Sequence, residues 1–199
     1  MDPVRFISNY SSGKMGIALA DAAVNYGADV TLVLGPTTLS PLNPAVNVIR
    51  VTDAASMAEV CIERFKNADV AILAAAVADY TPAQTHDDKM KKSSNKLTLT
   101  LKPTIDIAES LGKEKRESQI IAGFALETSD EMKNAQGKLR RKNLDLVVLN
   151  SLRDKGAGFE YDTNKITVID KYNNIDKFEL KTKDEAAKDI LDKIVSMIK

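Results

Sequence analysis

Short apolar, β-branched runs alternate along the chain with segments whose apolar residues recur at the helical period. Continuous apolar runs are typical of parallel strands covered on both faces, and their alternation with helices is typical of βαβ units. We therefore predict an α/β, Rossmann-like fold with a mostly parallel sheet and helices on both faces. The expected strands are 28–34, 46–51, 70–75, 120–126 and 145–149.

Capping and turn signals predict the remaining elements. The expected helices are 16–26, 53–66 with Asp53 as its cap, 129–143 with Ser129 as its cap, and a last one that Thr182 opens. Close to the end of the chain, 165–170 and 177–180 flank a turn at 172–174. This arrangement predicts a C-terminal β-hairpin.

The start of the chain departs from the usual pattern. A doubly wound sheet ordinarily opens on a strand and a glycine-rich turn, whereas Met1-Asp2-Pro3 leads directly into a loop. We therefore expect that the first strand is missing and that the domain is N-terminally incomplete. Residues 1–199 are otherwise predicted to form a single domain, because they hold no internal repeat and no linker-like stretch.

Charge and residue counts argue against several classes of function. The 28 basic and 28 acidic side chains cancel, so binding to nucleic acid is not expected. No apolar run approaches the ~20 residues of a membrane span. The single cysteine, Cys61, and the single histidine, His86, allow no internal disulfide and leave little for a zinc site. We expect a soluble, cytoplasmic protein with no membrane contact.

Two groups of lysines suit an anionic ligand. Lys89, Lys91 and Lys92 lie in the polar stretch 80–95, predicted to be a mobile surface loop or flap that closes over phosphates. Lys138 and Lys142 are four positions apart on one face of a predicted helix, where like charges repel mildly unless an anion lies between them. The alternative for both groups is a solvated surface, the commoner outcome for a run of charges.

Two further stretches belong to the same expected edge of the sheet. Small hydroxyl residues and glycines over 8–16 precede a helix, and its N-terminus can bind an anion through backbone N–H groups. The alternative is that Ser11 and Ser12 only cap that helix. The stretch 74–80 lies at the carboxyl end of a predicted strand, where open α/β sheets bind ligands. Its Asp79 would bind a ribose hydroxyl or a metal-bound water, and the alternative is that Asp79 is a turn residue. Together these features predict a nucleoside triphosphate site.

The order of these segments resembles one known family. The opening DPVRFISNYSSGKMG at 2–16 closely resembles the opening motif of bacterial phosphopantothenoylcysteine synthetases. The family's further motifs follow in its order over nearly the whole chain, as AAAVADY at 74–80, the lysines at 89, 91 and 92, GFALET at 123–128 and KNLD at 142–145.

The resemblance implies a two-step, CTP-dependent ligation in coenzyme A biosynthesis. The carboxylate of 4′-phosphopantothenate attacks the α-phosphate of CTP, which releases pyrophosphate and leaves an acyl-cytidylate. The amine of cysteine then displaces CMP and forms the amide. Mg²⁺, held mainly by the CTP phosphates, and nearby lysines would offset the charge of the triphosphate.

The resemblance also assigns roles to individual residues. Asn9 would hold the acyl-cytidylate and assist the attack of cysteine, and Lys89 would contact a phosphate or the reacting carbonyl. The CTP site would be formed by Ala74, Ala75 and Asp79, by the turn Ile105-Asp106-Ile107, by Phe124 near the cytosine, and by Lys138 and Lys142 at the phosphates. This chain has Ile105-Asp106 where the family usually has Pro-Asp.

Partners are implied as well. Members of the family are homodimers in which the partner subunit completes the substrate site, and closure is expected at 80–95. In many bacteria the domain is fused behind a flavin-dependent phosphopantothenoylcysteine decarboxylase. Nothing in this sequence resembles that half, so no flavin is expected on this chain.

Two rival interpretations stay open. An NAD(P)-dependent reductase on the same fold would need an acidic residue at the end of the second strand, where Leu34 is instead followed by Gly35-Pro36. A non-enzymatic nucleotide-binding module, with the basic loop serving a partner, is compatible with the same residues.

Overall fold

The computed structural model describes residues 1–91, 96–127, 129–151, 156, 158 and 161–198. It contains a five-stranded sheet with the strand order β10-β9-β7-β6-β3. Strands β3, β6 and β7 are parallel, and β9 and β10 continue the sheet as antiparallel neighbours. The strands are β3 (Val70–Leu73), β6 (Ile120–Glu127), β7 (Leu146–Ser151), β9 (Ile166–Asp170) and β10 (Ile175–Lys177).

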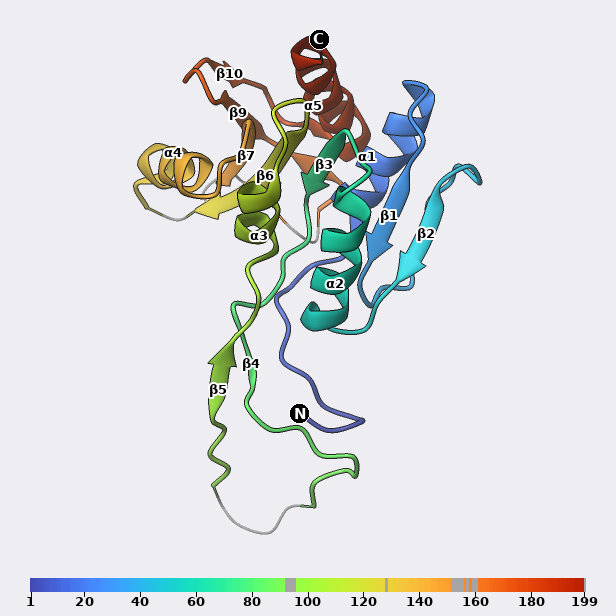
Figure 1. Cartoon of the computed structure of the whole chain (residues 1–199), viewed down its shortest axis with the longest axis vertical. Helices are drawn as coiled ribbons and strands as arrows, with labels where there is room; N and C mark the ends of the chain where they lie inside the picture. Colours follow the sequence, from blue (N-terminus) through green and yellow to red (C-terminus); the bar gives the residue numbers. More distant parts are fainter. Residues whose placement is uncertain (92–95, 128, 152–155, 157, 159–160, 199) are drawn as a thin grey trace.

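A second, two-stranded parallel sheet lies beside the first (Figure 1). It pairs β1 (Thr31–Leu34) with β2 (Asn47–Arg50). Among the described residues no backbone ladder joins β1 to β3, so β3 is the edge strand of the larger sheet. All four of its residues are only half-buried. The run 70–75 was predicted to be a central strand covered on both faces, and this prediction is wrong because β3 has a strand neighbour on one side only.

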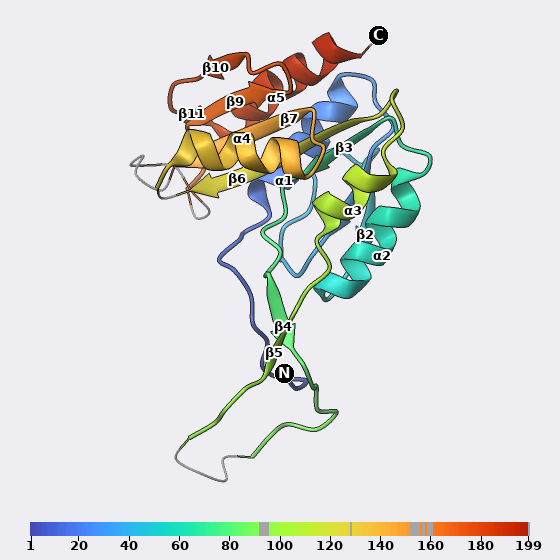
Figure 2. The same cartoon turned by 60° about the vertical axis from the view of Figure 1, so that its left-hand side comes forward.

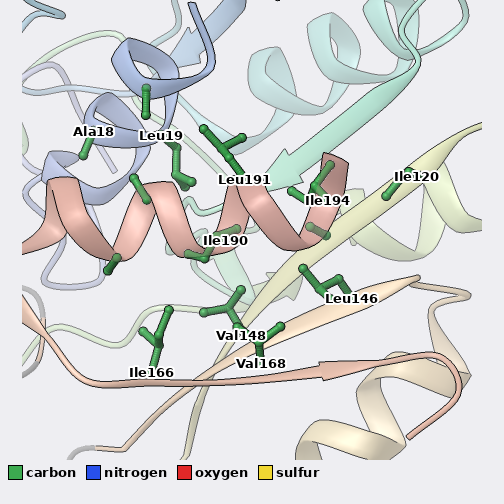
Figure 3. Close-up of a cluster of buried hydrophobic side chains, with 14 residues drawn as sticks. Ala18, Leu19, Ile120, Leu146, Val148, Ile166, Val168, Ile190, Leu191 and Ile194 are labelled. Atoms are coloured by element: carbon green, nitrogen blue, oxygen red, sulfur yellow. The ribbon is translucent and has the colours of Figure 1, made fainter. Parts of the chain in front are cut away.

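Helices cover both faces of the five-stranded sheet, as the alternation of apolar runs predicts (Figure 2). On one face, α1 (Lys14–Asn25) and α5 (Lys183–Met197) pack against the strands through Leu19, Ile190 and Ile194. Figure 3 shows these helix side chains above Leu146, Val148 and Val168, whose neighbours along the strands point to the opposite face.

The opposite face of the sheet carries three helices. Here Ile121, Val147 and Ile169 are fully buried under side chains of the helices. The helices are α2 (Ala54–Phe65), α3 (Ile107–Glu114) and α4 (Glu131–Arg141). Because strand residues alternate between the faces, both hydrophobic cores use the same strands β6, β7 and β9.

A thin arm extends away from the sheets and helices (Figures 1 and 2). Its two chain segments are joined by the antiparallel ladder of β4 (Tyr80–Pro82) and β5 (Leu101–Pro103). The N-terminal segment runs beside them, and the backbone N–H of His86 donates to Met1 O at 3.0 Å. The prediction of a loop over 80–95 therefore has to be corrected at β4, and 92–95 lie outside the described residues.

Other elements also differ from prediction. The cap of α4 is Asp130, in the left-handed region with φ 47° and without a side-chain cap bond, rather than Ser129. The hairpin strand β10 ends at Lys177, where the predicted strand begins, because the Asp170 carboxylate closes the turn early by accepting the N–H groups of Tyr172 and Asn174. Helix α3 was not predicted.

Two short strands complete the structure. β8 (Thr163–Asn164) pairs with β11 (Lys181–Thr182) immediately before α5. Thr182 opens α5 as predicted, since its hydroxyl accepts the backbone N–H of Glu185 in a capping box. Within the described part of the chain, no helix is both long and apolar enough to span a membrane.

Candidate functional site

A cavity of about 550 Å³ lies between α4 and the segments that leave β3 and β6. Five of its lining side chains are basic and two are acidic. The cavity is therefore suited to an anionic ligand, and its two carboxylates could bind a metal ion that accompanies the anion. It is lined by Asp79, Glu127, Lys133, Asn134, Gly137, Lys138, Arg140, Arg141 and Lys142. A smaller hollow of about 270 Å³ on α5 holds none of the predicted residues.

Lys138 is a half-buried cationic side chain of the cavity. Its Nζ donates to Phe124 O at 2.5 Å, which fixes the amine at the carboxyl end of β6. Burial, followed by the charge of Lys142, lowers the pKa of Lys138 below its ordinary value. Unlike a freely solvated lysine, this amine would gain much from an incoming anion, because the site already disfavours its charge.

Lys142 is paired with a carboxylate on the neighbouring helix. Its Nζ lies 2.7 Å from Asp106 Oδ2, and its side chain is only 13% exposed. Asp106 also caps α3 by accepting the backbone N–H of Glu109 at 3.0 Å. The ion pair and this cap, set against partial burial, lower the pKa of the Asp106 carboxyl. Two predicted CTP residues thus neutralise each other across α3 and α4.

Helix α3 approaches the end of α4 without an intervening side chain. A Cβ atom on Gly112 would lie 2.0 Å from Lys142 O, a distance that no real contact allows. Asn143, in the left-handed region with φ 51°, donates through Nδ2 to Gly112 O at 2.9 Å. Lys115 Nζ donates to Asn143 O at 2.8 Å. These contacts fix Lys142 and Asp106 relative to each other.

Gly112→Ala is therefore expected to destabilise the protein by about 1–3 kcal/mol, because the added methyl group must push α3 away from the Lys142 carbonyl. Thermal unfolding would measure this change. Gly137→Ala is the matched control, since a Cβ there meets nothing within 4 Å and alanine favours a helix by up to about 1 kcal/mol. Equal melting temperatures for the two variants would contradict the close contact.

The other residues predicted to bind the nucleotide differ in how close they lie to this cavity and in how exposed they are. Asp79 lines the cavity, and its backbone carbonyl accepts the N–H of Thr104 at 2.9 Å. Ala74 and Ala75 leave β3 toward the same edge, and Ala75 is exposed. Ile105 is exposed, whereas the side chain of Ile107 belongs to the hydrophobic core.

Ile107 is the first residue of α3 and its side chain packs in the core, so at this position of the predicted turn the backbone would face a nucleotide. The role of the turn stays a prediction. Phe124 is half-buried on β6 and packs against the core on the α1–α5 face, while its carbonyl holds Lys138.

Asn9 and Lys89 lie outside the cavity lining. Asn9 is exposed, and its Nδ2 donates weakly to Ala76 O at 3.4 Å and Val77 O at 3.3 Å. Lys89 lies in the arm, in the segment that contacts the first residues of the chain. Lys138, Lys142 and Asp79 thus line one cavity, whereas Lys89 does not line it within one copy of the chain, and the roles of Asn9 and Lys89 stay predictions.

Several lining residues were missed from the sequence. Arg141 lies three positions after Lys138, a spacing that helical periodicity could have shown, whereas Lys133 lies five positions before Lys138 and no helical spacing connects the two. Glu127 ends β6 and accepts Asn134 Nδ2 at 3.2 Å. Asp79 and Glu127 are the kind of oxygen donors that Mg²⁺ uses alongside phosphates and water, so the cavity fits a magnesium–triphosphate complex.

Residues 1–198 match the family described as the DNA/pantothenate metabolism flavoprotein C-terminal domain. A curated relative from an unknown prokaryotic organism, named cysteine/cysteine sulfinic acid decarboxylase, is 62% identical over 100% of this chain and 55% of its own length. The coenzyme A biosynthesis bifunctional protein CoaBC of Bacillus subtilis is 44% identical, over 100% of this chain and 49% of its own. The chain thus spans about half the length of these relatives.

A solved structure resembles the whole arrangement. The crystal structure of the C-terminal domain of the coenzyme A biosynthesis bifunctional protein CoaBC matches 98% of this chain and 88% of its own, with 40% identity and a TM-score of 0.82. The family match over nearly the full length and the agreement in fold lead to one conclusion. The chain belongs to the family of DNA/pantothenate metabolism flavoprotein C-terminal domains.

Proposed function

We propose that the chain is a phosphopantothenate–cysteine ligase that uses CTP in coenzyme A biosynthesis. The observation that carries the proposal is the cavity in which Lys138 and Lys142 from the end of α4 and Asp79 from the segment after β3 line one basic space. The name of the Bacillus subtilis relative, a coenzyme A biosynthesis bifunctional protein, agrees with it.

The proposed reaction has two steps. A carboxylate oxygen of 4′-phosphopantothenate attacks the α-phosphorus of CTP, the bond to the β-phosphate breaks, and pyrophosphate leaves. The neutral amine of cysteine then attacks the acyl carbon, CMP leaves with the electron pair of the acyl–oxygen bond, and the amine proton is released. Activation is needed because a free carboxylate has no good leaving group.

Residues of this chain would hold the triphosphate at the start of this sequence. Lys142 would exchange its bond with Asp106 for a phosphate oxygen, and Lys138 would turn from Phe124 O toward the same anion. Asp79 and Glu127 would hold Mg²⁺ together with phosphate oxygens and water, and the bound metal would neutralise charge on the leaving pyrophosphate. Ala75, without a long side chain, would leave room for the nucleotide.

We further propose that the active form is a homodimer in which the arm of one copy completes the site of the other. Lys89 does not line the cavity of its own copy, and the arm and the N-terminal segment beside it contain exposed apolar side chains. Phe6 is 77% exposed and Leu97 is 61% exposed. Several exposed apolar side chains on one thin extension are what a partner surface would cover.

The decarboxylase activity named for one relative is not proposed for this chain. That name describes a protein of which the chain spans 55%. Five of the described lining residues of the cavity are cations suited to phosphate. The basic cavity favours a triphosphate ligand.

Pyrophosphate release from CTP tests the proposal. Release is expected only when 4′-phosphopantothenate and Mg²⁺ are present, and amide formation only when cysteine is added.

CTP with Mg²⁺ should also raise the melting temperature of the protein, whereas NADPH should not. Lys142→Ala should abolish this shift, and Lys188→Ala, on exposed α5 surface, should retain it. A rise in melting temperature with NADPH but not with CTP, or pyrophosphate release without 4′-phosphopantothenate, would contradict the proposal.

The affinity for CTP should fall as the pH rises through the lowered pKa of Lys138. Only the protonated amine attracts phosphate, so binding is strongest below that pKa and weakens above it, at a pH lower than the ordinary 10.5 of lysine. Lys138→Arg keeps its charge and should move the fall to higher pH. Calorimetric titrations across the alkaline range would measure this, with Lys133→Arg as control. Superimposable profiles for Lys138→Arg and the wild type would refute the assignment.

A further inference from the structure

The Asp2 carboxylate joins the N-terminal segment to the lysine-bearing stretch of the arm. Its Oδ1 accepts the backbone N–H groups of Val4 at 2.9 Å and Arg5 at 2.8 Å. Its Oδ2 accepts the backbone N–H of Met90 at 3.1 Å and Arg5 Nε at 3.0 Å, and Arg5 Nη2 forms an ion pair with the same oxygen. The Asp2 side chain is 0% exposed, although it lies in a thin arm.

Arg5 strengthens the same junction from the other side. Its Nη2 also donates to Met90 O at 2.8 Å, so both backbone groups of Met90 are bound by the Asp2–Arg5 pair. The backbone N–H of His86 donates to Met1 O at 3.0 Å. The segment 86–90, which includes Lys89, is thus attached to residues 1–5 at both of its ends.

The same N-terminal segment carries Asn9. Only Phe6, Ile7 and Ser8 separate Arg5 from Asn9, so their Cα atoms can be at most about 14 Å apart. Because Met90 is bound to Asp2 and Arg5, the junction couples the location of Lys89 to that of Asn9. Without the junction, the segment that carries Asn9 and the segment that carries Lys89 would be free to move relative to each other.

We propose that Asp2 is a positioning residue: its carboxylate clamps the Lys89 segment onto the segment that carries Asn9, so that both groups reach the reaction site as one unit. This inference rests on the proposed ligase function for its catalytic consequence, and on the hydrogen bonds of Asp2 for the clamp itself. Arg5 holds the pKa of the Asp2 carboxyl far below its usual range, so the clamp stays charged at every pH at which the reaction would be measured.

Asp2→Asn isolates the clamp from the local turn. The amide oxygen can still accept the N–H groups of Val4 and Arg5, whereas the amide nitrogen is a donor that faces the donors of Met90 and Arg5. Asp53→Asn is the matched control. It makes the same chemical change at the cap of α2, where the carboxylate accepts the N–H groups of Ala55 and Ser56 and where asparagine is an equally good cap.

Trypsin cleavage after Lys89 and Lys91 in the folded chain measures the clamp without any assay of activity. Loss of charge-assisted bonds should raise the cleavage rate in Asp2→Asn by about tenfold or more, because local opening becomes less costly. Asp53→Asn should be cleaved at the wild-type rate. An unchanged rate in Asp2→Asn overturns the clamp.

A double-mutant cycle with Lys89→Ala measures the positioning. In the wild-type background, Asp2→Asn should lower kcat/KM for amide formation about tenfold, and in the Lys89→Ala background it should lower it no further. Equal loss in both backgrounds means that Asp2 supports the fold in general, and this overturns the positioning role. If the wild type itself forms no amide, the proposed function fails, and the trypsin rates alone still support or overturn the clamp.

Discussion

Asn9→Asp is expected to stop amide formation while pyrophosphate is still released from CTP. Within the described part of the chain, the carboxamide Nδ2 of Asn9 makes two long contacts, to Ala76 O and Val77 O, which it can exchange for a substrate oxygen. In the second step an oxyanion develops on the carbonyl oxygen of the acyl group, and a preorganised donor to this oxygen contributes roughly 10²–10³ in rate. The carboxylate of aspartate cannot donate and repels the oxyanion.

The measurement is a single turnover with CTP and 4′-phosphopantothenate, followed by mass spectrometry of the acyl-cytidylate before and after cysteine is added. The intermediate should persist in Asn9→Asp and disappear in the wild type. Asn47→Asp, the same change on exposed β2, should behave like the wild type. Amide formation by Asn9→Asp at the wild-type rate would remove Asn9 from the reaction.

Asp145→Asn should lower the free energy of unfolding by about 3–5 kcal/mol, because it leaves buried positive charge without a partner. Asp145 is buried, and its carboxylate binds Lys115 Nζ at 2.8 Å, Lys171 Nζ at 2.9 Å and the backbone N–H of Ile121 at 2.9 Å. The Lys115 side chain is only 10% exposed. These bonds join the starts of β6 and β7 to α3 and to the β9–β10 turn.

Chemical denaturation at neutral pH would measure the change. Asp176→Asn is the control, because Asp176 is 45% exposed in its pair with Lys193 and such pairs contribute about 1 kcal/mol or less. The Lys115 and Lys171 bonds outweigh the effect of burial and lower the pKa of Asp145, so its contribution is present above the unfolded value and disappears as the pH falls through the folded one. Similar losses in both variants would contradict this account.

The strands at the centre of the fold could be predicted because they need no context. The run 120–126 has no polar side chain, and 145–149 is apolar after Asp145; they form most of β6 and β7, which both helical layers cover. Helix α3 escaped prediction for the opposite reason. It has few apolar residues and contains Gly112, and an isolated helix of eight residues is marginal in water. Packing against the end of α4 stabilises α3, and the local sequence of α3 does not show this packing.

In the candidate site, too, local spacing could be predicted from the sequence, whereas contacts between distant segments could not. The spacing of Lys138 and Lys142 placed both on one face of a helix, and both line the basic cavity. Their hydrogen-bonded partners, Phe124 O and the Asp106 carboxylate, come from distant segments that no local pattern connects to them. The direction of the arm was equally hidden, because the composition of 80–95 indicates a loop but not which residues it contacts. The roles of all these residues stay predictions.

The contact at Gly112 has a mechanical consequence for the cavity. With no room for even a methyl group between α3 and the Lys142 carbonyl, neither helix can slide along the other by a fraction of a turn. A ligand that draws Lys142 inward must therefore also move α3, and Asp106 with it, so the two helices are expected to move as one rigid unit. The hydrogen-exchange rates of the backbone amides in both helices should then fall together when a ligand fills the cavity.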